Sequence, residues 1–178
     1  VVILLAHPNI KESQANKALV DAVSDMEGVA VFNLYELSQE IAFNIDEWSK
    51  IISDASAVIY QFPFYWMSAP SLLKKWQDEI FTFLSKTPAV AGKPLTVVTT
   101  TGSEYEAYRS GGRNRFTTDE LLRPYQVSAI HSGMSWQTPI VVYGMGTADA
   151  GKNIAEGANL YKQRVEMLIG HSNAGNNW

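Results

Sequence analysis

The chain has 178 residues, 46% of them hydrophobic and 18% charged, which is enough for one domain with a buried core. A formal net charge of −4 gives no basic footprint, so we expect no nucleic-acid partner. No apolar run approaches the roughly 20 residues that span a bilayer, and the apolar start at 1–6 is too short for a signal peptide. The absence of cysteine excludes disulfides and thiol catalysis, and His131 and His171 lack partners at metal-ligand spacing. We therefore expect one cytoplasmic domain over 1–178 without a metal site.

Short apolar runs alternate with helical patterns along the whole chain. The runs are rich in Val and Ile and apolar on successive residues, which is typical of strands covered on both faces of a parallel sheet. The predicted strands are 1–6, 29–34, 56–61, 95–100 and 139–143, and the predicted helices are 14–26, 46–54, 70–84, 118–132 and 148–169. This alternation predicts an α/β fold with one doubly wound parallel sheet of five strands, followed by a loose tail at 170–178.

The first candidate site follows the first predicted strand, where His7-Pro8 leads to Ser13-Gln14-Ala15-Asn16 at a helix start. The first N–H groups of a helix have no intrahelical partner, and its dipole favours an anion there. Ser13 and His7 could add donors to a phosphate, and Asn16 could fasten the loop. The alternative is that Ser13 is simply the N-cap of the helix. The segment has no glycine, so it is neither a Walker loop nor a dinucleotide fingerprint.

The second candidate site is the stretch QFPFYWMSAP at 61–70, which follows an apolar strand. Its aromatic side chains indicate a wall for a flat ligand, a buried corner or a subunit interface. The third candidate is the run Thr99-Thr100-Thr101-Gly102-Ser103, whose hydroxyls could bind a polar ring edge or simply form a turn. In the strand order 2-1-3-4-5, the loops after strands one, three and four converge at the switch point. A phosphate site, an aromatic wall and polar edge contacts together predict a site for flavin mononucleotide (FMN).

The chain resembles the flavodoxin-2 family of NAD(P)H:quinone oxidoreductases, especially the short bacterial ancillary proteins of glutathione-regulated potassium efflux systems. The matching motifs are AHP at 6–8, SxAN at 13–16, QFPFYW with its continuation at 61–81, TTGS-like residues at 100–103, FTTDELLRP at 116–124 and GMSWQTPIVVYG at 133–144. The resemblance implies a flavodoxin-like fold of order 2-1-3-4-5, a homodimer and a non-covalently bound flavin.

The resemblance also assigns roles to residues. The phosphate and ribityl chain of the flavin would be held by His7, Ser13, Gln14, Ala15 and Asn16. The isoalloxazine would be lined by Phe64, Tyr65, Trp66 and Met67, and its polar edge would contact Thr100, Thr101, Gly102 and Ser103. The family's Gly-aromatic-Ala-Tyr-Gly loop is replaced here by the shorter TFLSKTPAVAGK at 82–93, which favours FMN over FAD.

The reaction that the resemblance implies is hydride transfer from NAD(P)H through the flavin to a quinone or similar small acceptor. Larger members of the family place a Tyr and a His over the flavin. This sequence keeps Tyr105 and Tyr108, of which Tyr108 is our candidate proton donor, but no histidine follows and Asn114 stands near that place. Arg109, Arg113 and Arg115 form either a solvated loop or a site for the phosphate of NADPH. Two other functions stay open: a regulatory subunit bound to a potassium antiporter at the inner face of the membrane, and a flavodoxin-like electron carrier.

Overall fold

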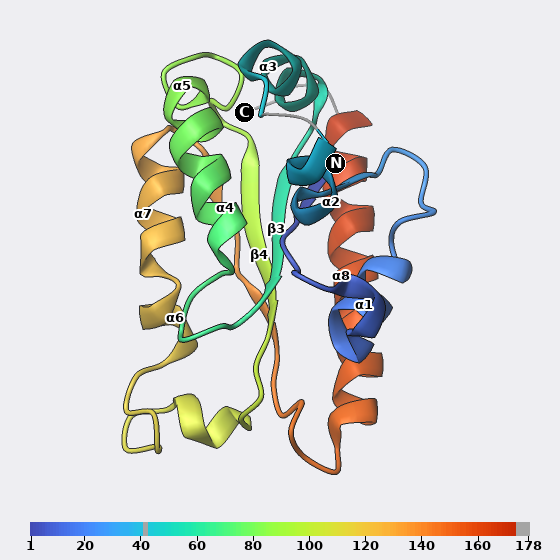
Figure 1. The fold of residues 1–178 in the computed structure, drawn as a ribbon, viewed down its shortest axis with the longest axis vertical. Coiled ribbons are helices and arrows are strands. Elements are labelled where there is room, and N and C mark those ends of the chain that lie inside the picture. Colours follow the sequence, from blue (N-terminus) through green and yellow to red (C-terminus); the bar gives the residue numbers. More distant parts are fainter. Residues whose placement is uncertain (41–42, 174–178) are drawn as a thin grey trace.

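The fold is a parallel sheet with helices on both faces, seen in a computed structural model that describes residues 1–40 and 43–173 (Figure 1). The sheet has the order β2-β1-β3-β4-β5, and β6 also pairs with β4. Its strands are β1 (Val2–Leu5), β2 (Ala30–Asn33), β3 (Val58–Pro63), β4 (Pro94–Thr100), β5 (Ser135–Trp136) and β6 (Ile140–Val142), and all the pairings are parallel. The predicted flavodoxin-like class is confirmed.

The fifth position of the sheet is filled by two short strands rather than one. β5 pairs with the start of β4 at Pro94 and Leu95, whereas β6 pairs with its end from Val98 to Thr100. Pro139 lies between them and has no N–H to donate to a ladder, which fits the interruption. The predicted strand 139–143 is therefore confirmed as β6, and β5 is an addition to it.

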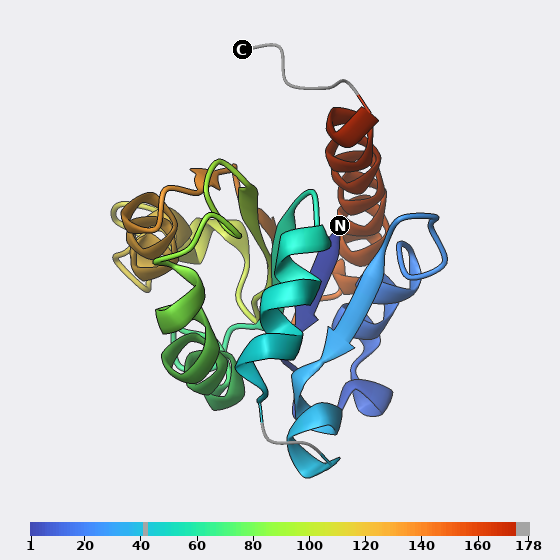
Figure 2. The same ribbon diagram turned by 90° about the horizontal axis from the view of Figure 1, so that it is seen from above.

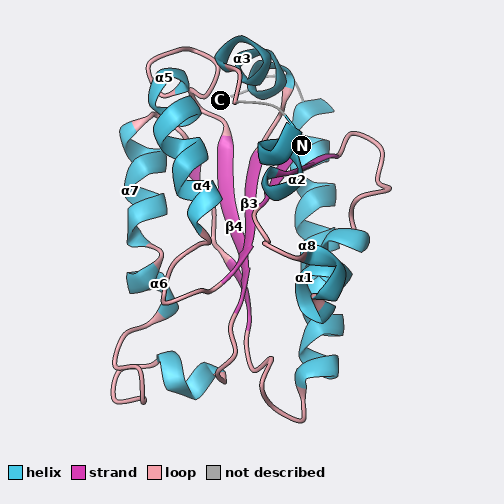
Figure 3. Ribbon diagram, in the orientation of Figure 1, coloured by secondary structure: helices cyan, strands magenta, loops and turns pink. Residues whose placement is uncertain are grey.

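Helices cover the sheet on both sides, as the view from above shows (Figure 2). On one face lie α1 (Gln14–Asp21) and α8 (Ala150–Asn173). The other face is covered by α3 (Ile45–Asp54), α4 (Ser71–Trp76), the π-helical turn η2 (Gln77–Phe81), α5 (Thr82–Leu84) and α7 (Arg123–His131). The remaining elements are α2 (Leu34–Glu40), α6 (Thr118–Leu121) and two 3₁₀ turns, η1 (Ile10–Glu12) and η3 (Tyr105–Tyr108). Figure 3 shows how loops at one end of the strands connect these layers.

The strand sequences are apolar throughout because successive side chains enter two different cores. Val2 and Leu4 pack into the core beneath α3, α4 and α7, while Val1 and Ile3 pack into the core beneath α1 and α8. Trp76 lies in the first core, is 1% exposed and contacts Trp48 edge-on at 5.3 Å. Trp76 is therefore a core residue of this chain.

Several helix boundaries differ from the prediction for local reasons. The helix predicted at 118–132 is divided into α6 and α7, because Pro124 cannot donate the backbone bond that would continue α6. α2 was not predicted at all. α8 continues to Asn173, so it takes in part of the segment expected to be a loose tail, and residues 174–178 lie outside the described residues. Within 1–40 and 43–173, no helix is long and apolar enough to cross a membrane.

Candidate functional site

A cavity of about 390 Å³ opens at the carboxyl ends of β1, β3 and β4, where the strand order reverses. It is lined by His7, Ser13, Gln14, Ala15, Asn16, Pro63, Phe64, Tyr65, Thr100, Thr101, Gly102, Met145, Ala150 and Ile154. Every residue predicted to bind the flavin is in this set except Trp66, Met67 and Ser103. The three predicted loops do converge, as the order 2-1-3-4-5 requires.

The first turn of α1 provides donors at one end of the cavity. Ser13 is the N-cap, and its Oγ accepts the N–H of Asn16 at 3.1 Å. The alternative that Ser13 is the N-cap of the helix is thus correct. Capping uses only the oxygen as an acceptor, so the hydroxyl hydrogen of Ser13 is left for another partner. Helix geometry gives the N–H groups of Gln14 and Ala15 no acceptor within α1. These donors, with the dipole of the helix, suit an anion.

His7 is a neutral donor beside this helix start. Burial lowers the pKa of its imidazole below the usual value, so the ring is uncharged at neutral pH. Its Nδ1 accepts the N–H of Asn9 at 3.1 Å, which places the ring hydrogen on Nε2. The ring also packs edge-on against Tyr65, with centroids 6.4 Å apart. His7 therefore offers one hydrogen-bond donor without adding a charge.

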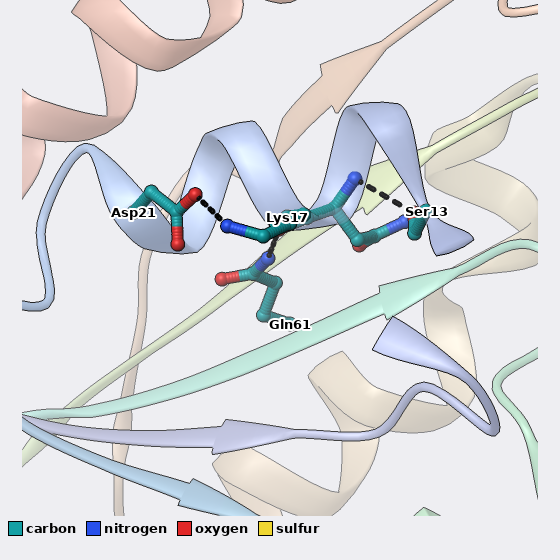
Figure 4. A network of polar contacts seen from close by, with 5 residues as sticks. Ser13, Lys17, Asp21 and Gln61 are labelled. Carbon is teal, nitrogen blue, oxygen red and sulfur yellow. Dashed lines mark hydrogen bonds and ion pairs between the residues drawn. The ribbon is translucent and has the colours of Figure 1, made fainter. Parts of the chain in front are cut away.

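Asn16 joins three elements beneath the cavity. Its side chain is buried, at 1% exposure, and its Nδ2 donates to Thr100 Oγ1 at 3.0 Å. Its backbone carbonyl accepts Nε2 of Gln61 at 2.8 Å, and Figure 4 shows Gln61 directed from β3 toward α1. The Oδ1 of Asn16 is buried without a donor in the described part of the chain. This atom and Oε1 of Gln61 are both covered by protein, and such unpaired buried acceptors are uncommon in folded proteins.

The aromatic stretch 61–70 divides its side chains among different environments. Phe62 is fully buried in the core, and Phe64 lines the cavity with its ring near-parallel to Phe62. Trp66 is 97% exposed and, like Met67, does not line the cavity. The expectations of a buried corner and of an aromatic wall are each right for part of the stretch. Exposure alone distinguishes Trp66 from the residues of the wall.

A tight turn sets the position of Trp66. The N–H and C=O of Tyr65 and Ser68 form reciprocal backbone hydrogen bonds at 2.9 and 3.2 Å. Trp66 and Met67, between them, have φ of 51° and 62°, the left-handed conformation that type I′ turns require at both central positions. Asn and Gly are the usual residues there. Large side chains in strained backbone positions beside a cavity are a recognised mark of functional sites.

The loop after β4 is held by a segment that the sequence did not single out. Backbone N–H groups of Gly144, Met145 and Gly146 donate to the carbonyls of Ser103, Thr101 and Gly102 at 2.8 to 2.9 Å. A Cβ on Gly146 would lie 3.1 Å from the carbonyl oxygen of Gly102, so only glycine fits comfortably. This pairing brings Met145 to the cavity, and Ala150 and Ile154 follow at the start of α8. The G-x-G pattern directly after a predicted strand was the available signal.

Thr101, Gly102 and Ser103 differ in what they can offer a ligand. Thr101 uses its N–H for Val142 O and its Oγ1 for Ser103 O, and Ser103 Oγ accepts from Arg113 at 2.6 Å. Both residues therefore serve the loop itself. The N–H of Gly102 has no acceptor in the described residues, and the space above its Cα is open. Gly102 is the donor that this loop presents.

Tyr108 lies apart from the cavity. It is 5% exposed and packs against Phe64 and Tyr143, with ring centroids 6.3 and 5.9 Å away. It lines instead a second cavity of about 560 Å³ at the edge of β6, together with Tyr105 and Arg109. Its position does not support the predicted role of proton donor.

The predicted arginine cluster is divided among separate contacts. Arg109 lies over the ring of Tyr105 at 5.5 Å, and Arg113 is bound to Ser103. Arg115 has a φ of 61° in the loop that follows. Arg109 and Arg113 thus have contacts within the loop, and a site for the phosphate of NADPH stays a prediction.

The strand order and the cavity at the switch point define a flavodoxin-like protein. The flavodoxin-2 family model, described as a flavodoxin-like fold, matches residues 1–165, and the chain belongs to this family. One relative, named as an uncharacterized NAD(P)H oxidoreductase, YdeQ, of Bacillus subtilis (strain 168), is 34% identical over 171 residues, covering 94% of this chain and 86% of its own. The potassium-efflux ancillary protein KefG of Serratia proteamaculans (strain 568) is 32% identical over 182 residues, covering 100% and 91%.

Solved structures share the fold closely. A structure titled as a thermophilic tryptophan halogenase from Streptomycin violaceusniger has a TM-score of 0.86 at 35% identity, covering 93% of this chain and 98% of that one. General stress protein 14 of Treponema denticola, in complex with FMN, has a TM-score of 0.85 at 28% identity and covers 94% and 98%. An NADPH-quinone reductase from P. pentosaceus has a TM-score of 0.75 at 25% identity and covers 90% and 96%.

Proposed function

We propose that the chain is an FMN-dependent NAD(P)H:quinone oxidoreductase whose cofactor occupies the cavity of about 390 Å³. The observation that carries this proposal is the convergence of complementary groups on that cavity. Unpaired N–H groups at the start of α1 suit a phosphate. Phe64 and Tyr65 suit the flat ring system.

The residues present fit FMN without any help from a positive side chain. No Lys or Arg is among the residues that line the described cavity, so the phosphate would be held by Gln14 and Ala15 N–H, the Ser13 hydroxyl and His7 Nε2. The N–H of Gly102 would donate to the polar edge of the ring, where negative charge grows on reduction. FMN would supply the hydride and electron chemistry itself, accepting a hydride from NAD(P)H and passing two electrons to the acceptor.

Relatives support the choice of cofactor and reaction. The Treponema denticola neighbour holds FMN, and the relatives include proteins named as an NAD(P)H oxidoreductase and an NADPH-quinone reductase. The segment 82–93 leads into the amino end of β4 and none of its residues lines the cavity, so its length does not bear on the choice between FMN and FAD. A quinone or a similar planar acceptor would use the same open face of the cavity in a second half-reaction, giving ping-pong kinetics.

The test is a titration followed by rapid kinetics. FMN added to the purified protein should bind stoichiometrically, with changes in its visible spectrum and quenching of its fluorescence. In anaerobic stopped flow, NADH or NADPH should then bleach the flavin band, and menadione should restore it. Failure to bind FMN would overturn the whole proposal. Binding without reduction by either nucleotide would overturn the enzymatic part.

A regulatory role is the second candidate, and the likeness to KefG over the whole chain favours it. In that case the flavin-bound protein would act as an ancillary subunit of a potassium antiporter. Co-purification with membranes that contain such an antiporter, lost when the antiporter is deleted, would support this role. The same preparation would show slow reduction by both nucleotides.

We also propose that the chain forms a homodimer. Large apolar side chains are exposed on α7, with Val127 60% and Ile130 62% accessible. Such surfaces often mark contacts between subunits. Light scattering at micromolar concentration should give twice the mass of 19.7 kDa, and a monomer would contradict the proposal.

A further inference from the structure

Gln61 is a buried polar residue in the middle of an apolar strand. β3 reads VIYQFP, every residue of it is buried, and Gln61 has no exposed surface. Its neighbours Tyr60 and Phe62 belong to the core beneath α4. An amide in such a place is costly unless it is hydrogen-bonded. Its presence there therefore calls for a specific partner.

That partner is the first turn of α1. Gln61 Nε2 donates to the backbone carbonyl of Asn16 at 2.8 Å, across 45 residues of sequence, while its Oε1 has no donor among the described residues. The backbone carbonyl of Gln61 accepts the N–H of Ala6 at 2.8 Å, where the chain leaves β1 for the first loop. Gln61 thus joins the end of β1, the end of β3 and the start of α1. It does not line the cavity itself.

The connection continues through the side chain of Asn16. Its Nδ2 donates to Oγ1 of Thr100, which lines the cavity and is 5% exposed. Because this Oγ1 accepts a hydrogen bond from Asn16, the hydroxyl hydrogen of Thr100 remains to be donated to a ligand. A buried chain of contacts therefore runs from Gln61 through Asn16 to Thr100. It holds the N-terminal turn of α1 at a fixed place relative to the loop after β4.

We propose that Gln61 is a positioning residue that sets the first turn of α1 for the phosphate end of the ligand, through Asn16 and without touching the ligand. The identity of the ligand rests on the proposed function. The positioning itself rests on contacts within the chain. A displaced helix start would aim the N–H groups of Gln14 and Ala15 away from the anion, while leaving the aromatic wall at Phe64 unchanged.

Gln61→Met tests the proposal, because methionine has a similar shape and cannot donate. The matched control is Thr99→Val. Thr99 is also fully buried on the neighbouring strand, donates its Oγ1 to Phe62 O at 2.7 Å, and does not line the cavity. The probes are FMN and riboflavin, which differ by the phosphate. Amide hydrogen exchange of residues 13–18 in the protein without flavin is measured alongside.

The expected result is that Gln61→Met weakens FMN binding about tenfold and riboflavin binding far less, since only the phosphate uses the helix start. Exchange in the first turn of α1 should be faster than in Thr99→Val at equal global stability. An unchanged preference for FMN over riboflavin together with unchanged exchange would overturn the proposal. If the methionine variant does not fold, Gln61→Leu is measured in the same way.

These readouts separate this inference from the proposed function. Wild-type protein that fails to bind FMN would contradict the function, and faster exchange in Gln61→Met would still support the positioning role. Wild-type protein that binds FMN, with the same affinity and the same exchange in Gln61→Met, would contradict the positioning role alone.

Discussion

The floor and the rim of the cavity are built in opposite ways. The floor (Asn16 and Thr100, with Gln61 beneath them) is at most 5% exposed and is held by hydrogen bonds that join different elements. The rim (Tyr65 to Ser68) carries Trp66 at 97% and Met67 at 43% exposure. Its turn is closed by its own backbone, and Ser68 Oγ contacts the hydroxyl of Tyr125 on α7 at 3.2 Å. A buried floor fixes where polar atoms of a ligand lie. An exposed rim leaves its side chains free to adapt to what arrives.

Asn16→Leu should have the largest effect, because it removes the contact between α1 and Thr100. We expect FMN affinity to fall by about 100-fold, equivalent to roughly 2.7 kcal/mol. Fluorescence titration measures it, with Thr99→Val as the control. A fall of less than threefold would contradict the role of Asn16 in the floor.

Replacing the central residues of the rim turn, Trp66→Asn with Met67→Gly, should stabilise the fold. Both new residues adopt positive φ more readily, so we expect the free energy of unfolding to rise by about 1 kcal/mol. Urea denaturation measures this change. Trp66→Ala alone keeps the strained backbone and should leave stability almost unchanged. A loss of stability in the double variant would show that the large side chains support the turn.

His7 should make stability depend on pH. Burial lowers the pKa of the folded-state imidazole below its unfolded value near 6.5, so the unfolded chain binds a proton first as the pH falls. The stabilising contribution is complete above about pH 6.5 and is lost as the pH falls through the folded-state pKa. Wild type should therefore lose more stability than His7→Gln between pH 7.5 and 5.5 in thermal unfolding. Parallel losses in the two proteins would contradict this reasoning.

Lys17→Ala should have the smallest effect, although Lys17 lies on the helix that carries the floor. Its ion pair with Asp21 is exposed on the outer side of α1, with half of each side chain accessible (Figure 4). Exposed i,i+4 pairs contribute about 0.3–0.5 kcal/mol, so stability should change by no more than that and FMN binding should stay the same. A clear loss of binding would mean that the surface pair, rather than the buried floor, orients α1.

The place of the site followed from the sequence, because strand ends and strand order determine which loops meet. Which side chains of these loops line the cavity did not follow from the sequence. Trp66 resembles Phe64 in the sequence, and the turn that exposes it carries none of the Asn or Gly residues usual at positive φ. Gln61 stands at the end of an apolar run, and the sequence does not reveal its structural role because its hydrogen-bond partner lies 45 residues away. The backbone pairing of 101–103 with 144–146 is likewise a long-range contact: the G-x-G pattern at 144–146 marks a turn but does not identify its partner.

The exposure of Trp66 gives the molecule a natural optical reporter. Trp48 and Trp76 are buried at 4% and 1% exposure, so their emission is shielded from a dissolved quencher such as acrylamide, whereas the indole of Trp66 is open to it. Because Trp66 lies on the turn beside the cavity, we expect a ligand that binds across the opening to change the solvent exposure of its indole. Comparing the emission of wild type with that of Trp66→Phe would isolate this signal and let arrival at the cavity be followed without a label.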